Sequence, residues 1–168
     1  MKYKDLFKYA KEHNIDEKLC SYLINNYLFI PNIDRIENIL LDKKVEKRFK
    51  HAIQRLKKEP IQYIVGNVDF YGYTYKVNKN TLIPRFETEE LVENTIKIIE
   101  KKFNKDIKLI DIGTGSGCIG ITIKKELPNI DVTLTDISTK ALKNAKDNSK
   151  QLDIKIIKSH ILKNIKKE

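Results

Sequence analysis

An acidic residue stands directly before a glycine-rich stretch, LIDIGTGSGCIG, at residues 109–120. Asp111 precedes Gly113, Gly115 and Gly117, which occupy alternate positions. Glycines permit positive φ and let a ligand approach the backbone closely, and the N-terminus of a following helix offers unpaired amides. The stretch therefore predicts a binding loop for a ligand that also needs a carboxylate nearby.

Two nucleoside cofactors are candidate ligands of this loop. The spacing Gly115-x-Gly117-x-x-Gly120 matches the dinucleotide fingerprint, yet Asp111 would repel a pyrophosphate bound there. The sulfonium and α-ammonium groups of S-adenosylmethionine instead suit a neighbouring carboxylate. Asp136, at the end of the next predicted strand, can accept hydrogen bonds from the ribose of either cofactor. The sequence favours S-adenosylmethionine, with a nicotinamide dinucleotide as the alternative.

Alternating strands and helices are predicted to position these residues. Strands are expected at residues 107–112, 130–135 and 154–159, and helices at 118–126 and from Ser138 to about 149. Short loops between such elements are typical of a parallel sheet with right-handed crossovers. The glycine loop and Asp136 then lie at the carboxyl ends of adjacent strands, where ligands bind in these sheets.

The first part of the sequence is predicted to be helical. Residues 1–58 carry three apolar stripes at helical spacing, which indicates a small helical bundle. Asn14 followed by Glu17 fits a capping box at the start of the second helix.

A hairpin is expected after Pro60, where β-branched and aromatic residues become frequent. Gly66-Asn67 is predicted as its turn. Tyr71, Tyr73 and Tyr75 are expected on one strand face, packed on the hairpin rather than stacked on nucleic acid bases. A further helix is predicted from Thr88.

Composition narrows the class of protein. The 168 residues are 40% hydrophobic and hold two cysteines, too few for a disulfide framework or a zinc site. No apolar run approaches the roughly 18 residues of a membrane span, and the N-terminal residues do not resemble a signal peptide, so a cytoplasmic setting is expected. The formal net charge is +10, but the lysines are spread along the chain. This distribution favours a solvated surface over a direct nucleic-acid partner.

Residues 59–93, EPIQYIVGNVDFYGYTYKVNKNTLIPRFETEELVE, together with the glycine loop, resemble the HemK-type family of peptide chain release factor glutamine methyltransferases. The matching elements are Glu59-Pro60-Ile61, Gly66, Phe70-Tyr71-Gly72, Leu82-Ile83-Pro84-Arg85 and Glu87-Thr88-Glu89. The related ribosomal-protein glutamine methyltransferases usually lack the last of these elements. The resemblance implies an α/β fold, with a Rossmann-like methyltransferase parallel sheet preceded by a small helical bundle and a β-hairpin.

The resemblance also implies an activity and a division of the chain. Residues 1–58 would form a substrate-docking domain, 59–80 a hairpin connector and 81–168 the front part of the methyltransferase domain. The reaction would move a methyl group from S-adenosylmethionine to a glutamine side-chain amide nitrogen of a release factor, without a metal. The implied cofactor-binding residues are Asp111, Gly113, Thr114, Gly115, Ser116, Gly117, Asp136 and Ile161, and the implied pocket residues are Ile83, Pro84, Arg85, Glu87 and Thr88.

Three departures from the family pattern qualify this reading. Phe86 stands where the family usually has a second proline, and His160 stands where an acid usually follows the third strand. The family's catalytic Asn-Pro-Pro-Tyr would lie after Glu168, so no catalytic residue is assigned, the sheet is expected to be truncated and this chain alone is expected to be inactive. The alternatives are a non-catalytic module that docks a release factor, or a ribosomal-protein or nucleic-acid amino methyltransferase.

Overall fold

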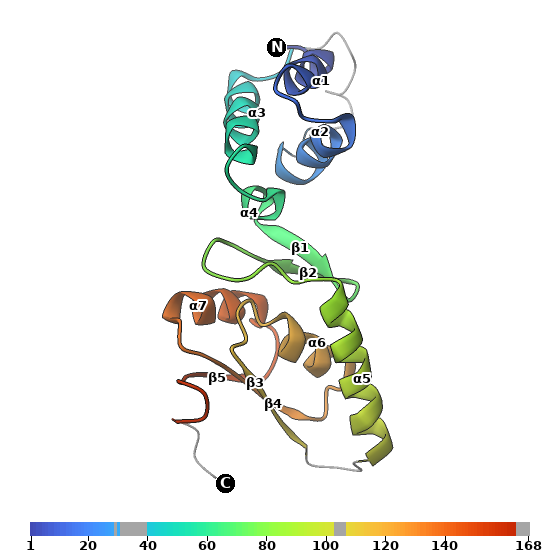
Figure 1. Ribbon diagram of the computed structural model, residues 1–168, viewed down its shortest axis with the longest axis vertical. Coiled ribbons are helices and arrows are strands. Elements are labelled where there is room, and N and C mark those ends of the chain that lie inside the picture. Colours follow the sequence, from blue (N-terminus) through green and yellow to red (C-terminus); the bar gives the residue numbers. More distant parts are fainter. Residues whose placement is uncertain (29, 31–39, 103–106, 164–168) are drawn as a thin grey trace. The chain divides into compact units, whose positions relative to one another are not determined.

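The computed structural model describes residues 1–28, 30, 40–102 and 107–163 and divides into two compact units, Met1–Val65 and Gly66–Glu168 (Figure 1). The first unit is helical, and the second contains a β-hairpin and a parallel sheet with helices. Among the described helices, none combines the length and the apolar character that a membrane crossing requires.

The first unit is a bundle of short helices. Its elements are α1 (Tyr3–Glu12), α2 (Glu17–Leu23), the π-helix η1 (Ile24–Leu28), α3 (Lys43–Leu56) and α4 (Ile61–Val65). The apolar stripes predicted from the sequence form one core, in which Leu6, Leu23, Phe49 and Ile53 are fully buried. The helices predicted in this region are therefore confirmed.

The predicted capping box at Asn14 is wrong. The N-cap of α2 is Asp16, whose side chain accepts a hydrogen bond from the backbone N–H of Leu19 at 2.8 Å. Asn14 instead takes part in ending α1, with a φ of 61° and its N–H donating to the carbonyl of Lys11. An Asn tolerates the left-handed conformation that closes a helix, which explains why it serves here as a stop rather than a start.

The hairpin exists, but its turn lies five residues later than predicted, and residues 61–65, predicted as its first strand, form helix α4 instead. Strands β1 (Asn67–Phe70) and β2 (Tyr73–Lys76) pair antiparallel, and Tyr71 and Gly72 form the turn with φ values of 51° and 73°. Positive φ at both central residues matches the twist of the strands in a two-residue turn. The N–H of Tyr71 donates to Oε1 of Glu89 at 2.9 Å, which helps to hold this conformation. Because Tyr71 lies in the turn and not in a strand, only Tyr73 and Tyr75 share a strand face.

A three-stranded parallel sheet forms the centre of the second unit. Its strands are β3 (Lys108–Ile112), β4 (Asp131–Asp136) and β5 (Ile154–Lys158), in that spatial order. Helices α6 (Cys118–Glu126) and α7 (Thr139–Asn148) are the crossovers, and α5 (Glu87–Lys102) packs against α6. The elements predicted from alternation are confirmed, and so is the α/β fold class with a Rossmann-like parallel sheet.

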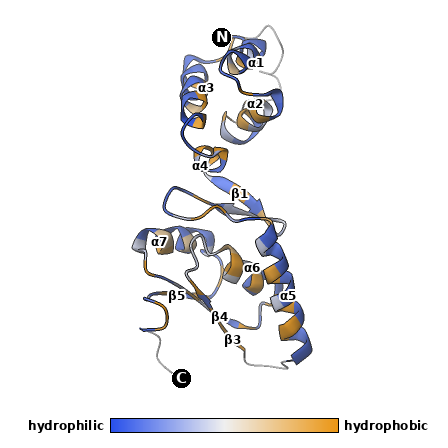
Figure 2. Cartoon of the chain, in the orientation of Figure 1, coloured by the Kyte–Doolittle hydropathy of each residue, from blue (hydrophilic) through white to orange (hydrophobic). Residues whose placement is uncertain are grey.

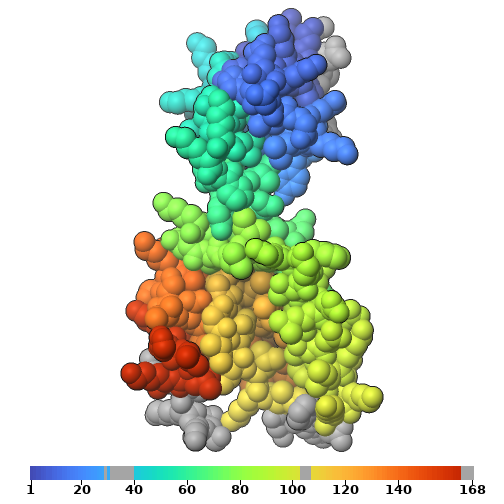
Figure 3. Space-filling model, viewed as in Figure 1, coloured from blue at the N-terminus to red at the C-terminus, as the bar shows by residue number. Residues whose placement is uncertain are grey.

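The helices cover one face of this sheet. Leu134 of β4, Ile121 of α6, Ala145 of α7 and Val92 of α5 are fully buried in a single cluster. Figure 2 shows α6 in hydrophobic colours over much of its length, and Figure 3 shows α7, the segment of α6 and α5 side by side. The packing fixes the strands in register, so that Asp111 pairs with Leu134 and Asp136 pairs with Lys158 at the carboxyl ends.

Candidate functional site

The glycine loop joins β3 to α6 and is built from left-handed backbone. Gly113, Gly115 and Gly117 have φ values of 72°, 57° and 85°. A Cβ added at Gly113 or Gly115 would meet no atom within 4 Å, so the space beside these two residues is open. A Cβ at Gly117 would lie 2.6 Å from Cδ1 of Ile121 and 3.3 Å from Cβ of Ala145, so this side of the loop is closely packed. The loop is therefore open to a ligand on one side and closely packed on the other.

Asp111 uses one carboxylate oxygen to hold the loop. Its Oδ2 accepts hydrogen bonds from Oγ1 of Thr114 at 2.6 Å and from the backbone N–H of Gly120 at 3.0 Å. Its Oδ1 accepts no hydrogen bond from the described residues. Burial raises the pKa of Asp111, the two hydrogen bonds oppose this, and Asp136 adds repulsion. The free oxygen is an acceptor that a cationic or N–H-bearing ligand could use.

Asp136 ends β4 and faces the same loop. Its Oδ2 accepts from the backbone N–H of Gly115 at 3.0 Å, and its Oδ1 accepts from the N–H of Ser138 at 2.8 Å. Ser138 in turn caps α7, because its hydroxyl accepts from the N–H of Ala141 at 3.2 Å. Each oxygen of Asp136 keeps a further acceptor position, so the carboxylate can orient the loop and still receive ligand hydroxyls.

An asparagine that the sequence analysis did not single out fixes the loop from the side. The amide nitrogen of Asn148 donates to the carbonyl of Ser116 at 2.8 Å and to the carbonyl of Lys76 at 3.0 Å. Its Oδ1 accepts from the N–H of Lys76 at 2.8 Å. Asn144, one helical turn earlier, also donates to Lys76 and to Thr81. Two asparagines spaced i, i+4 on a helix that packs against a sheet are the sequence signal that could have revealed this network.

Two exposed isoleucines flank the carboxyl ends of β4 and β5. Ile137 follows Asp136 and is 62% exposed, while Ile161 is 61% exposed and has a φ of 55°. The N–H of Ser159 donates to the carbonyl of Asp136 at 3.1 Å, which ties the end of β5 to the site. A β-branched residue with positive φ is strained, and such strain is often concentrated at ligand sites. His160, which lies between Ser159 and Ile161, is exposed.

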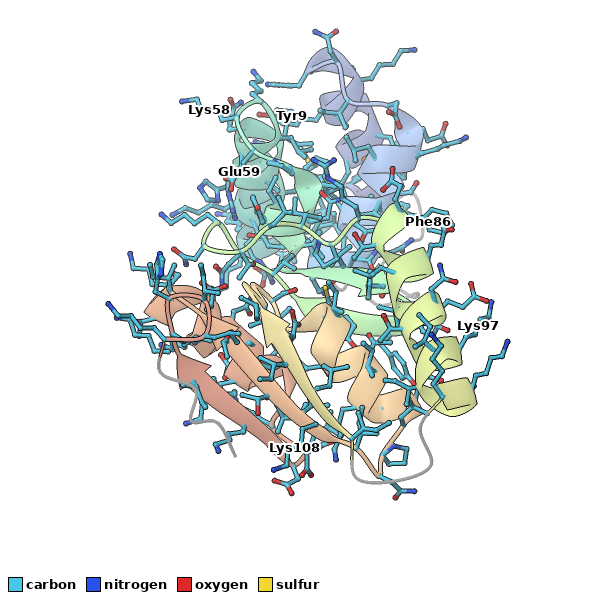
Figure 4. The ribbon with its side chains drawn as sticks, turned by 60° about the horizontal axis from the view of Figure 1, so that its bottom comes forward. Tyr9, Lys58, Glu59, Phe86, Lys97 and Lys108 are labelled. Carbon is cyan, nitrogen blue, oxygen red and sulfur yellow. The ribbon has the colours of Figure 1, made fainter. Side chains whose placement is uncertain are left out.

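The stretch from Ile83 to Thr88 contains the predicted pocket residues. It leads into α5, which begins at Glu87, and the N–H of Thr88 donates to the carbonyl of Arg85. Phe86 is 81% exposed at the beginning of α5 (Figure 4). Within the described ranges, no hydrogen bond or ion pair joins Ile83, Pro84, Arg85, Glu87 or Thr88 to the glycine loop. Their place in a substrate pocket therefore stays a prediction.

The arrangement suits a nucleoside ligand that carries positive charge. It combines two carboxylates, open backbone at Gly113 and Gly115, and two exposed isoleucines, Ile137 and Ile161, that follow the ends of β4 and β5. A flat base suits apolar side chains, ribose hydroxyls suit a carboxylate, and an ammonium or sulfonium suits the second carboxylate. Both carboxylates come from the ends of adjacent parallel strands, as the sequence predicted.

The comparison with known proteins agrees with this chemistry. Residues 86–168 match the family model described as "Methyltransferase small domain". Relatives named release factor glutamine methyltransferase are 50% identical in Flavobacterium psychrophilum and 46% identical in Staphylococcus aureus, each over 66% of this chain and 40% and 39% of the relative. A relative of the same name from Borreliella burgdorferi is 37% identical over 99% of this chain and 59% of its own length.

The chain thus spans between about two fifths and three fifths of the length of these relatives. The similarity extends through both units, because the match with the Borreliella burgdorferi protein includes nearly all of the chain. The resemblance to release factor glutamine methyltransferases that the motifs predicted is confirmed.

Proposed function

We propose that this chain, a relative of the release factor glutamine methyltransferases, binds S-adenosylmethionine at its glycine loop and serves methylation of a glutamine side chain in a release factor. The observation that carries the proposal is the pair of carboxylates, Asp111 and Asp136, that the fold brings to one loop with an oxygen of Asp111 left open. The relatives support the reaction and the substrate by their names. Cys20 and Cys118 are both free thiols, which agrees with a cytoplasmic setting.

Each group of the ligand has a residue to receive it. Oδ1 of Asp111 would attract the α-ammonium, the remaining acceptor positions of Asp136 would receive the ribose hydroxyls, and Ile137 and Ile161 would border the adenine. The open backbone at Gly113 and Gly115 leaves room for the methionine part. When bound, S-adenosylmethionine supplies an electrophilic methyl group, and the residues of this chain hold its carrier in place.

Calorimetry with the full chain tests the ligand assignment. We expect a binding signal with S-adenosylmethionine and none with a nicotinamide dinucleotide, because Asp111 would lie beside the pyrophosphate. Replacing Asp136→Ala should weaken binding by about 1–3 kcal/mol, or roughly 5–150-fold, the range for losing hydrogen bonds to a charged group. Asp131→Ala is the matched control, since Asp131 is exposed at the amino end of the same strand. Tight dinucleotide binding without an S-adenosylmethionine signal would overturn the assignment.

The substrate proposal needs a separate assay. Methyl-labelled cofactor is mixed with the chain and, in parallel, with a release factor, a ribosomal protein and an RNA. Label on a glutamine of the release factor would support the proposal, and label on RNA would instead support a nucleic-acid methyltransferase. If cofactor binds but no substrate is labelled, the result agrees with the expectation that this chain alone is inactive, and calorimetry with the release factor then tests whether the chain docks it.

A further inference from the structure

Helix α3 presents a face that carries only basic and polar side chains. Lys44, Lys47 and His51 recur at helical spacing in α3, with Arg48 beside them, and Lys58 follows two residues after the helix ends at Leu56; all five are exposed. The buried residues of the same helix, Phe49, Ala52 and Ile53, lie on the opposite side in the core. We call the five exposed residues the basic face of α3. Figure 2 shows the largely hydrophilic character of this helix, and Figure 4 labels Lys58 just after its end.

The described acidic residues at α3 already have partners, and Asp42, the N-cap, accepts from the backbone N–H of Lys44. Glu46 lies off the basic face and accepts from Nζ of Lys50 at 2.6 Å and from the N-terminal amine at 3.0 Å. Glu59 pairs with Arg55. Lys44, Lys47 and Lys58 form no ion pair with any described residue. Three lysine charges on one face are therefore left for a partner outside the described structure.

The kind of partner follows from the composition of this face. It holds no aromatic or large apolar residue, whereas protein–protein interfaces are anchored by buried aromatic and Arg side chains and are depleted in Lys. Its arginine is already engaged, because Nη2 of Arg48 donates to the carbonyl of Tyr27 at 2.6 Å and the guanidinium lies 4.9 Å from the Tyr27 ring. A face of mobile point charges fits a row of phosphates better than it fits a protein surface.

The form of the nucleic acid follows in the same way. Single strands are bound through aromatic stacking platforms, which this face lacks. Helices that read a DNA sequence present Arg, Asn or Gln to base edges, whereas duplex RNA is recognised by shape and by its backbone. Within the helix, Lys44 and His51 are separated by about 10 Å at a rise of 1.5 Å per residue, and Lys58 lies beyond the end of the helix. A line of about 10 Å runs beside roughly six backbone charges of a duplex.

We propose that the basic face of α3 docks on the phosphate backbone of double-stranded RNA. This surface belongs to the first unit, whereas the glycine loop belongs to the second, and the proposal does not depend on the methyltransferase assignment. The lysines that form it are scattered among other residues in the sequence, which is why composition alone predicted a solvated surface. Folding gathers them, because the apolar positions of α3 direct the remaining positions outward.

The test measures binding of the full chain to a fluorescent 20-base-pair RNA duplex by anisotropy between 50 and 200 mM salt. Each lost lysine–phosphate contact reduces the steepness of a plot of log affinity against log salt concentration, here called the salt slope, by roughly 0.9. The triple variant Lys44→Gln, Lys47→Gln, Lys58→Gln should lose about three such contacts. Over this salt range, wild-type affinity should then fall about 40-fold more than the affinity of the variant. Circular dichroism checks that both proteins are equally helical.

A matched variant separates position from net charge. Lys140→Gln, Lys143→Gln and Lys146→Gln remove three exposed lysines of α7 and should leave the salt slope close to the wild-type value. An equal effect of both triple variants would overturn the proposal, because binding would then follow total charge. It would also be overturned if a DNA duplex of the same length bound as tightly as the RNA, or if polyglutamate competed equally well at the same charge concentration.

Discussion

Replacing Asp111→Asn should separate the structural and the ligand-binding contributions of this carboxylate. In the folded protein, Oδ2 holds the loop through Thr114 and Gly120, and an amide oxygen can accept both hydrogen bonds. The substitution removes the charge whose burial raises the pKa of Asp111. We therefore expect the free energy of unfolding at neutral pH to be unchanged or higher, while S-adenosylmethionine binds about 1.5–3 kcal/mol more weakly, or roughly 10–150-fold.

The pH dependence gives an independent measurement of the same group. Because the pKa of Asp111 is raised on folding, the folded state binds more protons than the unfolded state at pH values between the two pKa values. The contribution of Asp111 to stability is thus fully present below the unfolded pKa of about 3.9 and is lost as pH rises through the folded pKa. The difference in the free energy of unfolding between wild type and Asp111→Asn at each pH isolates the contribution of Asp111 from those of the other carboxylates.

The assays are urea unfolding at several pH values and calorimetry with S-adenosylmethionine. Asp131→Asn, which removes an exposed carboxylate at the other end of the neighbouring strand, controls for net charge. A variant that loses several kcal/mol of stability and binds ligand as well as wild type would refute the reasoning, because Asp111 would then be a structural residue only.

Three further substitutions test the packing and pairing around the two cores. Gly120→Ala should lower the free energy of unfolding by about 1–3 kcal/mol, because the new Cβ would lie 2.4 Å from Cδ2 of the fully buried Leu134, and an unchanged urea midpoint would contradict this. Tyr75→Phe should cost about 1–2 kcal/mol, because its buried hydroxyl is 2.7 Å from Oγ1 of Thr122; in a double-mutant cycle, adding Thr122→Val should cost little more. Glu46→Gln should remove a stabilisation that wild type has above pH 4.5 and loses as the pH falls toward the lowered pKa of Glu46, about 2. Unfolding of both proteins is followed from about pH 7 to about pH 2, and identical stability curves would mean that the ion pairs of Glu46 contribute nothing.

The parts of the fold that the sequence predicted are those set by hydrophobic periodicity. The strands and helices after residue 107 were located to within about a residue, because their apolar positions alternate or recur at helical spacing and short loops separate them. The site followed from this topology, since Asp111 and Asp136 both end strands of a parallel sheet. Positions that depend only on local pattern and strand direction are accessible to sequence reasoning.

The parts that were missed depend on contacts across the sequence. The hairpin turn was misplaced because Tyr71 adopts a positive φ with the help of Glu89, a partner 18 positions later. Asn148 was overlooked because its role is to join Ser116 and Lys76, neither of which is near it in sequence. Single residues whose function is to satisfy distant backbone groups leave no local periodicity to detect.

The two carboxylates at the loop show how one site can serve folding and binding together. Asp136 gives an oxygen each to Gly115 and Ser138, so it fixes the loop before any ligand arrives, whereas Asp111 concentrates its loop contacts on one oxygen and leaves the other open. Burial of the carboxyl group as a whole disfavours its charged form, which is why the pKa of Asp111 is raised. A cation bound beside it would offset this cost, whereas a phosphate would increase it. The desolvation that disfavours the charged form of Asp111 in the folded chain is thus the same property that selects for a positively charged ligand.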